Sequence, residues 1–181
     1  MFMKLATKVQ EWITHNEWSE KISYNDENQT SSMSFIYIIN EQPFKAWVET
    51  YEHKNMVSVF IYAPFTALPN KRHDCSILFN HINNNNVWGG IACDENGSIR
   101  WRHSVDFEDT TPSVAAIENA FRVGGSIFKT WYDEIISVAL TKTTAQELIE
   151  YRNAAPEPEG VEVFNEYLAT QDYPSPLKSI H

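Results

Sequence analysis

Apolar residues follow a helical spacing at the start of the chain and a strand spacing in the residues that come next. Between residues 4 and 18 they fall on one face, which predicts an amphipathic helix that packs by that stripe. Three runs rich in β-branched and aromatic residues follow, at 33–40, 44–51 and 57–63. The breaks between these runs are short enough for hairpins, so the pattern predicts a three-stranded antiparallel meander, preceded by a short strand at 22–24.

Helical spacing returns after residue 70, where a middle helix is expected to run into the four asparagines at 83–86. Asparagine tolerates the left-handed conformation at a helix end, so this run is expected to form a C-cap and loop. Residues 87–93 and 98–108 then have strand patterns, and the Asn96-Gly97 step between them favours a hairpin turn. In the second of these strands, alternation places one set of side chains in the core and the other in solvent.

The longest pattern in the chain begins at Val114, where apolar residues recur at steps of three and four through Val138. It predicts a long helix that covers the sheet, and Gly124-Gly125 either kinks that helix or lets another element approach closely. A further helix is expected after residue 141, through Tyr151.

Together these elements predict an α+β fold, in which an antiparallel five-stranded sheet packs with an N-terminal, a middle and a long C-terminal helix. We expect one domain over residues 1–153. Residues 154–181 begin with an acidic, Pro-rich stretch typical of a linker, and within this tail 161–168 is compatible with one short helix.

Charge and cysteine content narrow the partner classes. The 14 Lys and Arg residues against 24 Asp and Glu leave a formal net charge of −10, which disfavours nucleic acid and anionic membranes as partners. No apolar run is long enough for a membrane span, and the N-terminus lacks the apolar stretch of a signal peptide. Cys75 and Cys93 lack metal-ligand spacing, so we expect two reduced thiols in a cytoplasmic protein.

No pattern in the chain points to catalysis, a metal or a cofactor. The six histidines lack the spacing of a zinc site, and nucleophile-elbow, Walker A and dinucleotide-binding motifs are missing from the sequence. Asp106, Glu108 and Asp109 form an acidic cluster that is expected to be solvated. An enzyme would need a closed polar pocket around Asp106 and His103, and we expect no catalytic residue.

Aromatic residues are the unusual feature, because 24 of the 181 residues are Phe, Trp or Tyr. Several predicted strands are apolar on both faces, so both faces of the sheet need cover. The second face is covered either by a second copy or a protein partner, or internally by loops and the tail. Four large aromatics on the predicted sheet are the candidate contacts to a protein partner: Tyr37, Trp47, Phe60 and Trp88. Arg100 and Arg102 face away from Trp101 and are expected to pair with acidic neighbours across the sheet.

Local sequence also carries a family resemblance. Its features are the strand 57–62 ending before a proline, the helical segment Leu78-Phe79-Asn80-His81-Ile82-Asn83, the stretches 90–94 and 96–102, and Trp131-Tyr132. In these features and in element order the chain resembles the YbjN family of bacterial sensory transduction regulators, with a type III secretion chaperone-like fold. The resemblance implies a regulator or chaperone-like protein and supplies no catalytic residue. The tail and the Asn-rich loop depart from it.

The first functional hypothesis is therefore a cytoplasmic, non-enzymatic protein-binding module, a homodimer that holds a segment of another protein in an apolar groove or on the sheet. The alternative is a scaffold regulator that recruits its partner through the tail, and an enzyme is the third possibility.

Overall fold

Six strands pair into one antiparallel sheet in the order β1-β2-β3-β4-β6-β5. The computed structural model describes residues 4–108, 110 and 112–154. The strands are β1 (Ser23–Asn25), β2 (Thr30–Ile39), β3 (Gln42–Tyr51), β4 (Met56–Thr66), β5 (Gly90–Cys93) and β6 (Ser98–Asp106). The helices are α1 (Lys4–His15), α2 (Arg72–Asn84), α3 (Val114–Leu140) and α4 (Ala145–Ala154), with 3₁₀ turns η1 (Glu52–Lys54) and η2 (Pro69–Lys71).

The α+β class and the antiparallel meander are confirmed, and the sheet has one strand more than the five expected. The additional strand is β1, a three-residue edge strand that pairs with the start of β2. The predicted strand at 87–93 begins only at Gly90, because Val87, Trp88 and Gly89 form the loop from α2. The middle helix ends at Asn84 as the asparagine run indicates, but its C-cap Asn85 has φ −99°, so no left-handed residue caps it.

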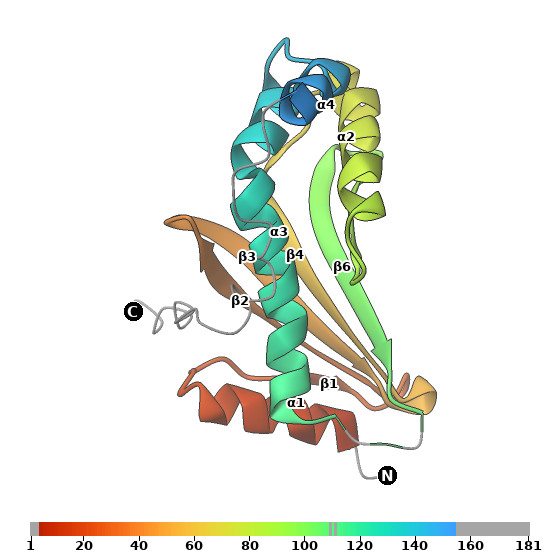
Figure 1. The fold of residues 1–181 in the computed structure, drawn as a ribbon. Helices are drawn as coiled ribbons and strands as arrows, with labels where there is room; N and C mark the ends of the chain where they lie inside the picture. Colours follow the sequence, from red (N-terminus) through yellow and green to blue (C-terminus); the bar gives the residue numbers. More distant parts are fainter. Residues whose placement is uncertain (1–3, 109, 111, 155–181) are drawn as a thin grey trace.

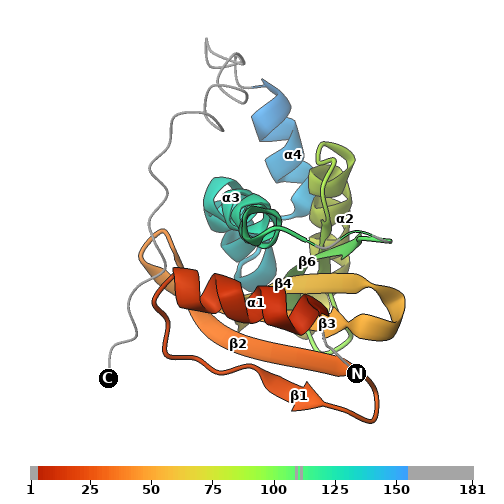
Figure 2. The same ribbon diagram turned by 90° about the horizontal axis from the view of Figure 1, so that it is seen from below.

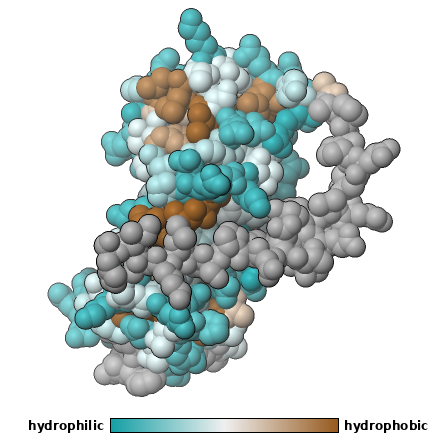
Figure 3. Space-filling model, turned by 90° about the vertical axis from the view of Figure 1, so that its left-hand side faces the viewer, coloured by the Kyte–Doolittle hydropathy of each residue, from teal (hydrophilic) through white to brown (hydrophobic). Residues whose placement is uncertain are grey.

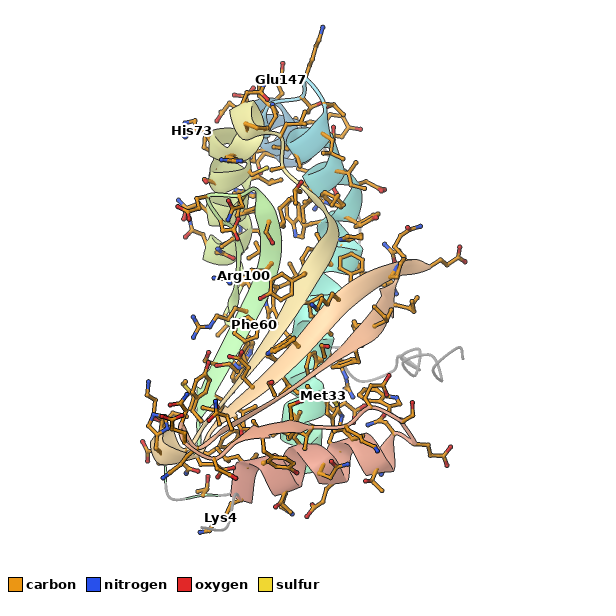
Figure 4. The ribbon with its side chains drawn as sticks, turned by 180° about the vertical axis from the view of Figure 1, so that it is seen from behind. Lys4, Met33, Phe60, His73, Arg100 and Glu147 are labelled. Carbon is orange, nitrogen blue, oxygen red and sulfur yellow. The ribbon has the colours of Figure 1, made fainter. Side chains whose placement is uncertain are left out.

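Helices cover one face of the sheet. Figure 1 shows α3 running along the strands and α1 crossing below it, and Figure 2 shows both helices on the same side of β2, β3 and β4. α2 lies beside β5 at one side of the sheet, and α4 packs against α2. Among the helices that the structure describes, none covers the opposite face of the central strands, which we call the open face (Figure 4).

The core between helices and sheet is built from the stripes that the sequence predicts. The α1 stripe is buried, and Trp12 stacks on Phe121 of α3 with ring centroids 5.1 Å apart. Farther along α3, Phe128 packs against Phe44 of β3 at 4.9 Å. Apolar burial of this kind stabilises by roughly 25 cal/mol per Å² removed from water, so this face carries most of the stability of the fold.

The glycine pair in α3 lets the sheet approach the helix. A Cβ atom on Gly124 would lie 2.4 Å from the fully buried indole of Trp101, and one on Gly125 would lie 2.9 Å from the ring of Tyr37. The sequence left two interpretations of Gly124-Gly125, a kink in the helix or the close approach of another element, and the structure supports the close approach.

Two charged side chains tie distant segments together. The carboxylate of Glu52 accepts hydrogen bonds from the backbone N–H groups of Leu5 and Ala6, at 3.2 and 2.8 Å, and so caps α1 from the turn after β3. Lys71 is buried, and its Nζ donates to Asp74 at 2.6 Å and to the Thr143 carbonyl at 2.8 Å. These bonds join the start of α2 to the connection between α3 and α4.

Candidate protein-binding face

The open face is organised by cross-strand register. Trp47 of β3 lies opposite Phe60 of β4, and Phe60 lies opposite Arg102 of β6. The next row joins Lys45, Tyr62 and Arg100 in the same way. Figure 4 shows Phe60 and Arg100 on neighbouring strands, on the face away from α3. Three strands therefore present aromatic rings and cations side by side.

The two arginines contact an aromatic ring rather than a carboxylate. The guanidinium carbons of Arg102 and Arg100 lie 5.5 and 6.0 Å from the centroid of the Phe60 ring. These are cation–π distances, and the long side chains leave only 8% of Phe60 exposed. The expected pairing of these arginines with acidic neighbours is therefore wrong for the described residues, because neither β4 nor β5, the strands on either side of β6, carries an acidic residue.

Hydrogen bonds hold the β3 side chains of the open face in place. The Glu49 carboxylate accepts from Trp47 Nε1 at 2.9 Å and from the Tyr51 hydroxyl. Burial, followed by the hydrogen bond to Glu49, raises the pKa of Tyr51 to about 12, so this phenol stays a donor at neutral pH. Lys45 Nζ lies 5.4 Å from the centroid of the Trp47 indole. The tryptophan is thus fixed between a cation and a carboxylate before any partner binds.

The four aromatics predicted as partner contacts do not form one site. Trp47 and Phe60 are neighbours on the open face. Tyr37 lies on the opposite, helix-covered face, where its ring meets Gly125 and Phe121. Trp88 is 59% exposed in the loop after α2, with its ring 5.8 Å from that of His103.

Sequence reasoning missed Tyr62 and both arginines as part of the Trp47–Phe60 surface. The alternation in residues 98–108 shows that Arg100 and Arg102 share a face. It does not show which strand lies beside them, because β4 and β6 are separated in the chain by α2 and β5.

Exposed apolar side chains also occur away from the open face. Tyr24, Val87, Trp88 and Tyr151 are each more than half exposed, whereas Ile36, which is also more than half exposed, lies opposite Lys45 and so belongs to the open face. On the side of the molecule seen in Figure 3, hydrophobic side chains form separate patches among hydrophilic ones. A hollow of about 250 Å³ lies between the loop after α2 and the middle of α3, and Trp88 and Trp131 both line it.

The residues considered for chemistry do not converge. His103 and Asp106 lie three positions apart on β6 and so point to opposite faces of the sheet. Burial lowers the pKa of His103, whose ring packs between Trp88 and Trp101. Asp106 accepts from the Glu108 backbone N–H at 2.8 Å. In the part of the chain that the structure describes, no group of three or more His, Cys, Asp or Glu side chains is placed to hold a metal ion.

The described helices include none that is long and apolar enough to cross a membrane. Both cysteines are free, with Cys75 buried and Cys93 half-buried. Burial raises the pKa of Cys75 to about 11 and that of Cys93 above its ordinary value. Neither thiol has the lowered pKa of a reactive nucleophile.

Comparison with known proteins finds similar chains among the solved structures. The chain is similar to the solved structure described as "Crystal structure of YbjN, a putative transcription regulator from E. coli", with TM-score 0.50 and 9% identity over 74% of this chain and 95% of that one. It is also similar to a chain of the HopA1–SchA chaperone–effector complex, with TM-score 0.46 and 15% identity over 71% of this chain and 91% of that one. No protein of curated function matches the sequence.

Residues 6–137 match the model of the YbjN family, described as "Putative bacterial sensory transduction regulator". That match runs from α1 almost to the end of α3, and so includes the whole sheet and both helices that cover it. The chain therefore belongs to the YbjN family.

Proposed function

We propose that this protein is a non-enzymatic regulator that binds a segment of another protein on the open face of its sheet. Trp47 lies at the centre of the binding surface, with Phe60 and Tyr62 beside it. The observation that carries the proposal is the packing of Arg100 and Arg102 over Phe60, next to a tryptophan that is only partly buried.

The chemistry of this face favours a partner segment that is both apolar and acidic. Trp47 and Tyr62 offer apolar area, and tryptophan, tyrosine and arginine are the residues that most often dominate binding energy at interfaces. Lys45, Arg100 and Arg102 stand in the two rows of aromatic residues, and Glu49 lies in the neighbouring row, opposite Ser58. A carboxylate of the partner segment can pair with a guanidinium of this face. The apolar side chains next to that carboxylate are buried against the aromatic rings of the same face.

A second copy of the chain is a poorer occupant of this face. Near the two-fold axis of a symmetric dimer each residue meets its own copy, so the arginine pair would face another arginine pair. The homodimer expected from the sequence is kept as a separate proposal that uses other surfaces. Its test is the mass in solution, and light scattering should give twice the 20.9 kDa of one chain.

Single-stranded nucleic acid is the second candidate, because aromatic rings beside cations on a sheet can stack bases and neutralise phosphates. The net charge of −10 opposes it, and the guanidiniums already cover Phe60. A protein segment therefore remains the proposal, and an oligonucleotide serves as a competing probe.

The proposal is tested by fluorescence anisotropy with a labelled peptide that alternates aspartate and leucine around one central phenylalanine. Two further probes are the same peptide with lysine in place of aspartate, and a single-stranded oligothymidylate of similar length. We expect the acidic peptide to bind most tightly. Trp47→Ala should weaken that binding by about tenfold or more, as for a central aromatic of an interface.

Trp88→Ala is the matched control, because it removes the same side chain from an exposed position away from the open face. It should leave the affinity within about twofold, which is the range of a neutral contact. Equal losses in both variants, or preference for the lysine peptide or the oligonucleotide, would contradict the proposal. A chain without residues 156–181 that melts normally should still bind, whereas loss of binding would favour the scaffold alternative that acts through the tail.

The cytoplasmic location and the lack of enzymatic activity belong to the same proposal. They are supported by the two free thiols and by the placement of His103 and Asp106 on opposite faces of β6.

A further inference from the structure

An apolar hollow on the helical side of the molecule is lined by side chains from two elements. Its volume is about 250 Å³, and it lies between the end of α2 with its following loop and the middle of α3. Six apolar side chains line it: Ile82, Val87, Trp88, Val123, Ile127 and Trp131. Val87 is 89% exposed and Trp88 is 59% exposed. Adjacent apolar side chains this open to water at the edge of a hollow are typical of a docking site.

The chain leaves the described structure at the rim of this hollow. Arg152 of α4 lies over the ring of Trp131, with the guanidinium carbon 3.8 Å from the centroid. Its Nη2 also donates to the carbonyl of Thr130 at 3.2 Å. Thr130 and Trp131 both line the hollow, and α4 ends two residues after Arg152, at Ala154. Whatever follows Ala154 therefore starts next to the hollow.

The tail has a segment of matching character at matching distance. Residues 155–160 include two prolines and can span at most about 20 Å when extended. In the segment 161–168, Val161, Phe164 and Leu168 have the spacing of one helical face, and Glu162 and Glu166 fall on the other side. An isolated helix this short is only marginally stable in water, so it needs a surface on which to form.

We propose that residues 161–168 dock as a short helix in this hollow of the same chain, with Phe164 packed between Trp88 and Trp131. The six-residue connection favours the chain's own tail over the tail of another copy. A tether this short raises the effective concentration of the segment to about the millimolar range. The docked tail covers Val87 and Trp88, and it uses the helical side of the molecule rather than the open face.

Disulfide trapping in the full-length chain tests the proposal. In a background with Cys75→Ala and Cys93→Ala, one protein carries Val87→Cys with Phe164→Cys. The control carries Tyr24→Cys with Phe164→Cys, because Tyr24 is also exposed but lies on β1 at the far edge of the sheet. We expect the Val87 pair to form an intramolecular disulfide on the order of tenfold faster than the control.

A second measurement does not depend on disulfide geometry. The same background then carries Val87→Cys as its single thiol. The tail should slow the reaction of this thiol with a maleimide severalfold, and adding Phe164→Asp should restore the fast reaction. Equal maleimide rates with and without Phe164→Asp would overturn the proposal. Crosslinks that join two chains and grow with protein concentration would also overturn it, and would assign the hollow to the tail of a second copy.

Discussion

The two adjacent glycines of α3 offer a sharp test of how closely the helix meets the sheet, because they face different neighbours. A Cβ atom on Gly124 would lie 2.4 Å from Trp101, whereas ordinary contacts begin at 3.4 Å. The indole would have to retreat by about 1 Å, but it is fully buried and its other edge lies against Gly89. A Cβ on Gly125 would meet the ring of Tyr37, a half-buried side chain that can turn aside.

Two opposing effects set the change in the free energy of unfolding that Gly124→Ala causes. Overpacking a closed core costs about 1–3 kcal/mol, and replacing glycine by alanine inside a helix stabilises it by about 1 kcal/mol. Since the Trp101 ring lies between two backbone segments, the upper end of the first range applies. We expect Gly124→Ala to lower the free energy of unfolding by about 2 kcal/mol, and the Tm by roughly 4–8 °C. For Gly125→Ala we expect no change, or stabilisation of up to about 1 kcal/mol.

Urea unfolding, followed by tryptophan fluorescence and circular dichroism, measures both variants against the unaltered chain. The double variant Gly124→Ala with Trp101→Phe should lose less stability than the sum of the two single changes, because the smaller ring makes room for the new methyl group. If Gly124→Ala stabilised the chain as much as Gly125→Ala does, that result would refute the close contact between α3 and Trp101.

Three further predictions concern charged and thiol side chains. Glu52→Ala should lower the free energy of unfolding by about 1 kcal/mol and speed hydrogen exchange in the first turn of α1, because it removes the carboxylate cap. The hydrogen bond from Lys71 lowers the pKa of Asp74, so this pair stabilises the fold above the ordinary carboxyl pKa and loses that contribution as the pH falls through the lowered value. Asp74→Asn should therefore lose more stability at pH 7 than at pH 3 in urea titrations. A thiol reagent should modify the half-buried Cys93 first, and reach Cys75, whose pKa is about 11, only when the chain unfolds; modification of Cys75 at the rate of Cys93 in the folded chain would contradict this order.

Much of the fold could be predicted because its elements have strong local signals. The stripes of α1 and α3, the three long strands and the Asn96-Gly97 turn all depend on side-chain period or on backbone preferences of a few residues. The edge strand β1 was visible only as a short apolar run at 22–24, and its place in the sheet depends on pairing with β2. The start of β5 at Gly90 was not visible, because apolar Val87 and Trp88 continue the strand pattern into a loop.

The candidate site was predicted only in part. Trp47 and Phe60 were identified as large aromatics on strands, and the structure makes them neighbours on the open face. Tyr37 and Trp88 carry the same sequence signal but lie elsewhere, on the helix-covered face and beside α3. The size of an aromatic side chain and its place in a predicted strand do not show which face of the sheet the helices cover.

By itself, the sequence determined the α+β class, the order of helices and strands, and the absence of familiar catalytic motifs, because each of these follows from residue types a few positions apart. Tertiary structure alone decided that Arg100 and Arg102 lie over Phe60, and that Arg152 lies over Trp131 where the chain leaves α4. These contacts join residues that are far apart in the chain. They depend on strand register and on which surface each helix buries, and the whole molecule sets both by burying the largest apolar area.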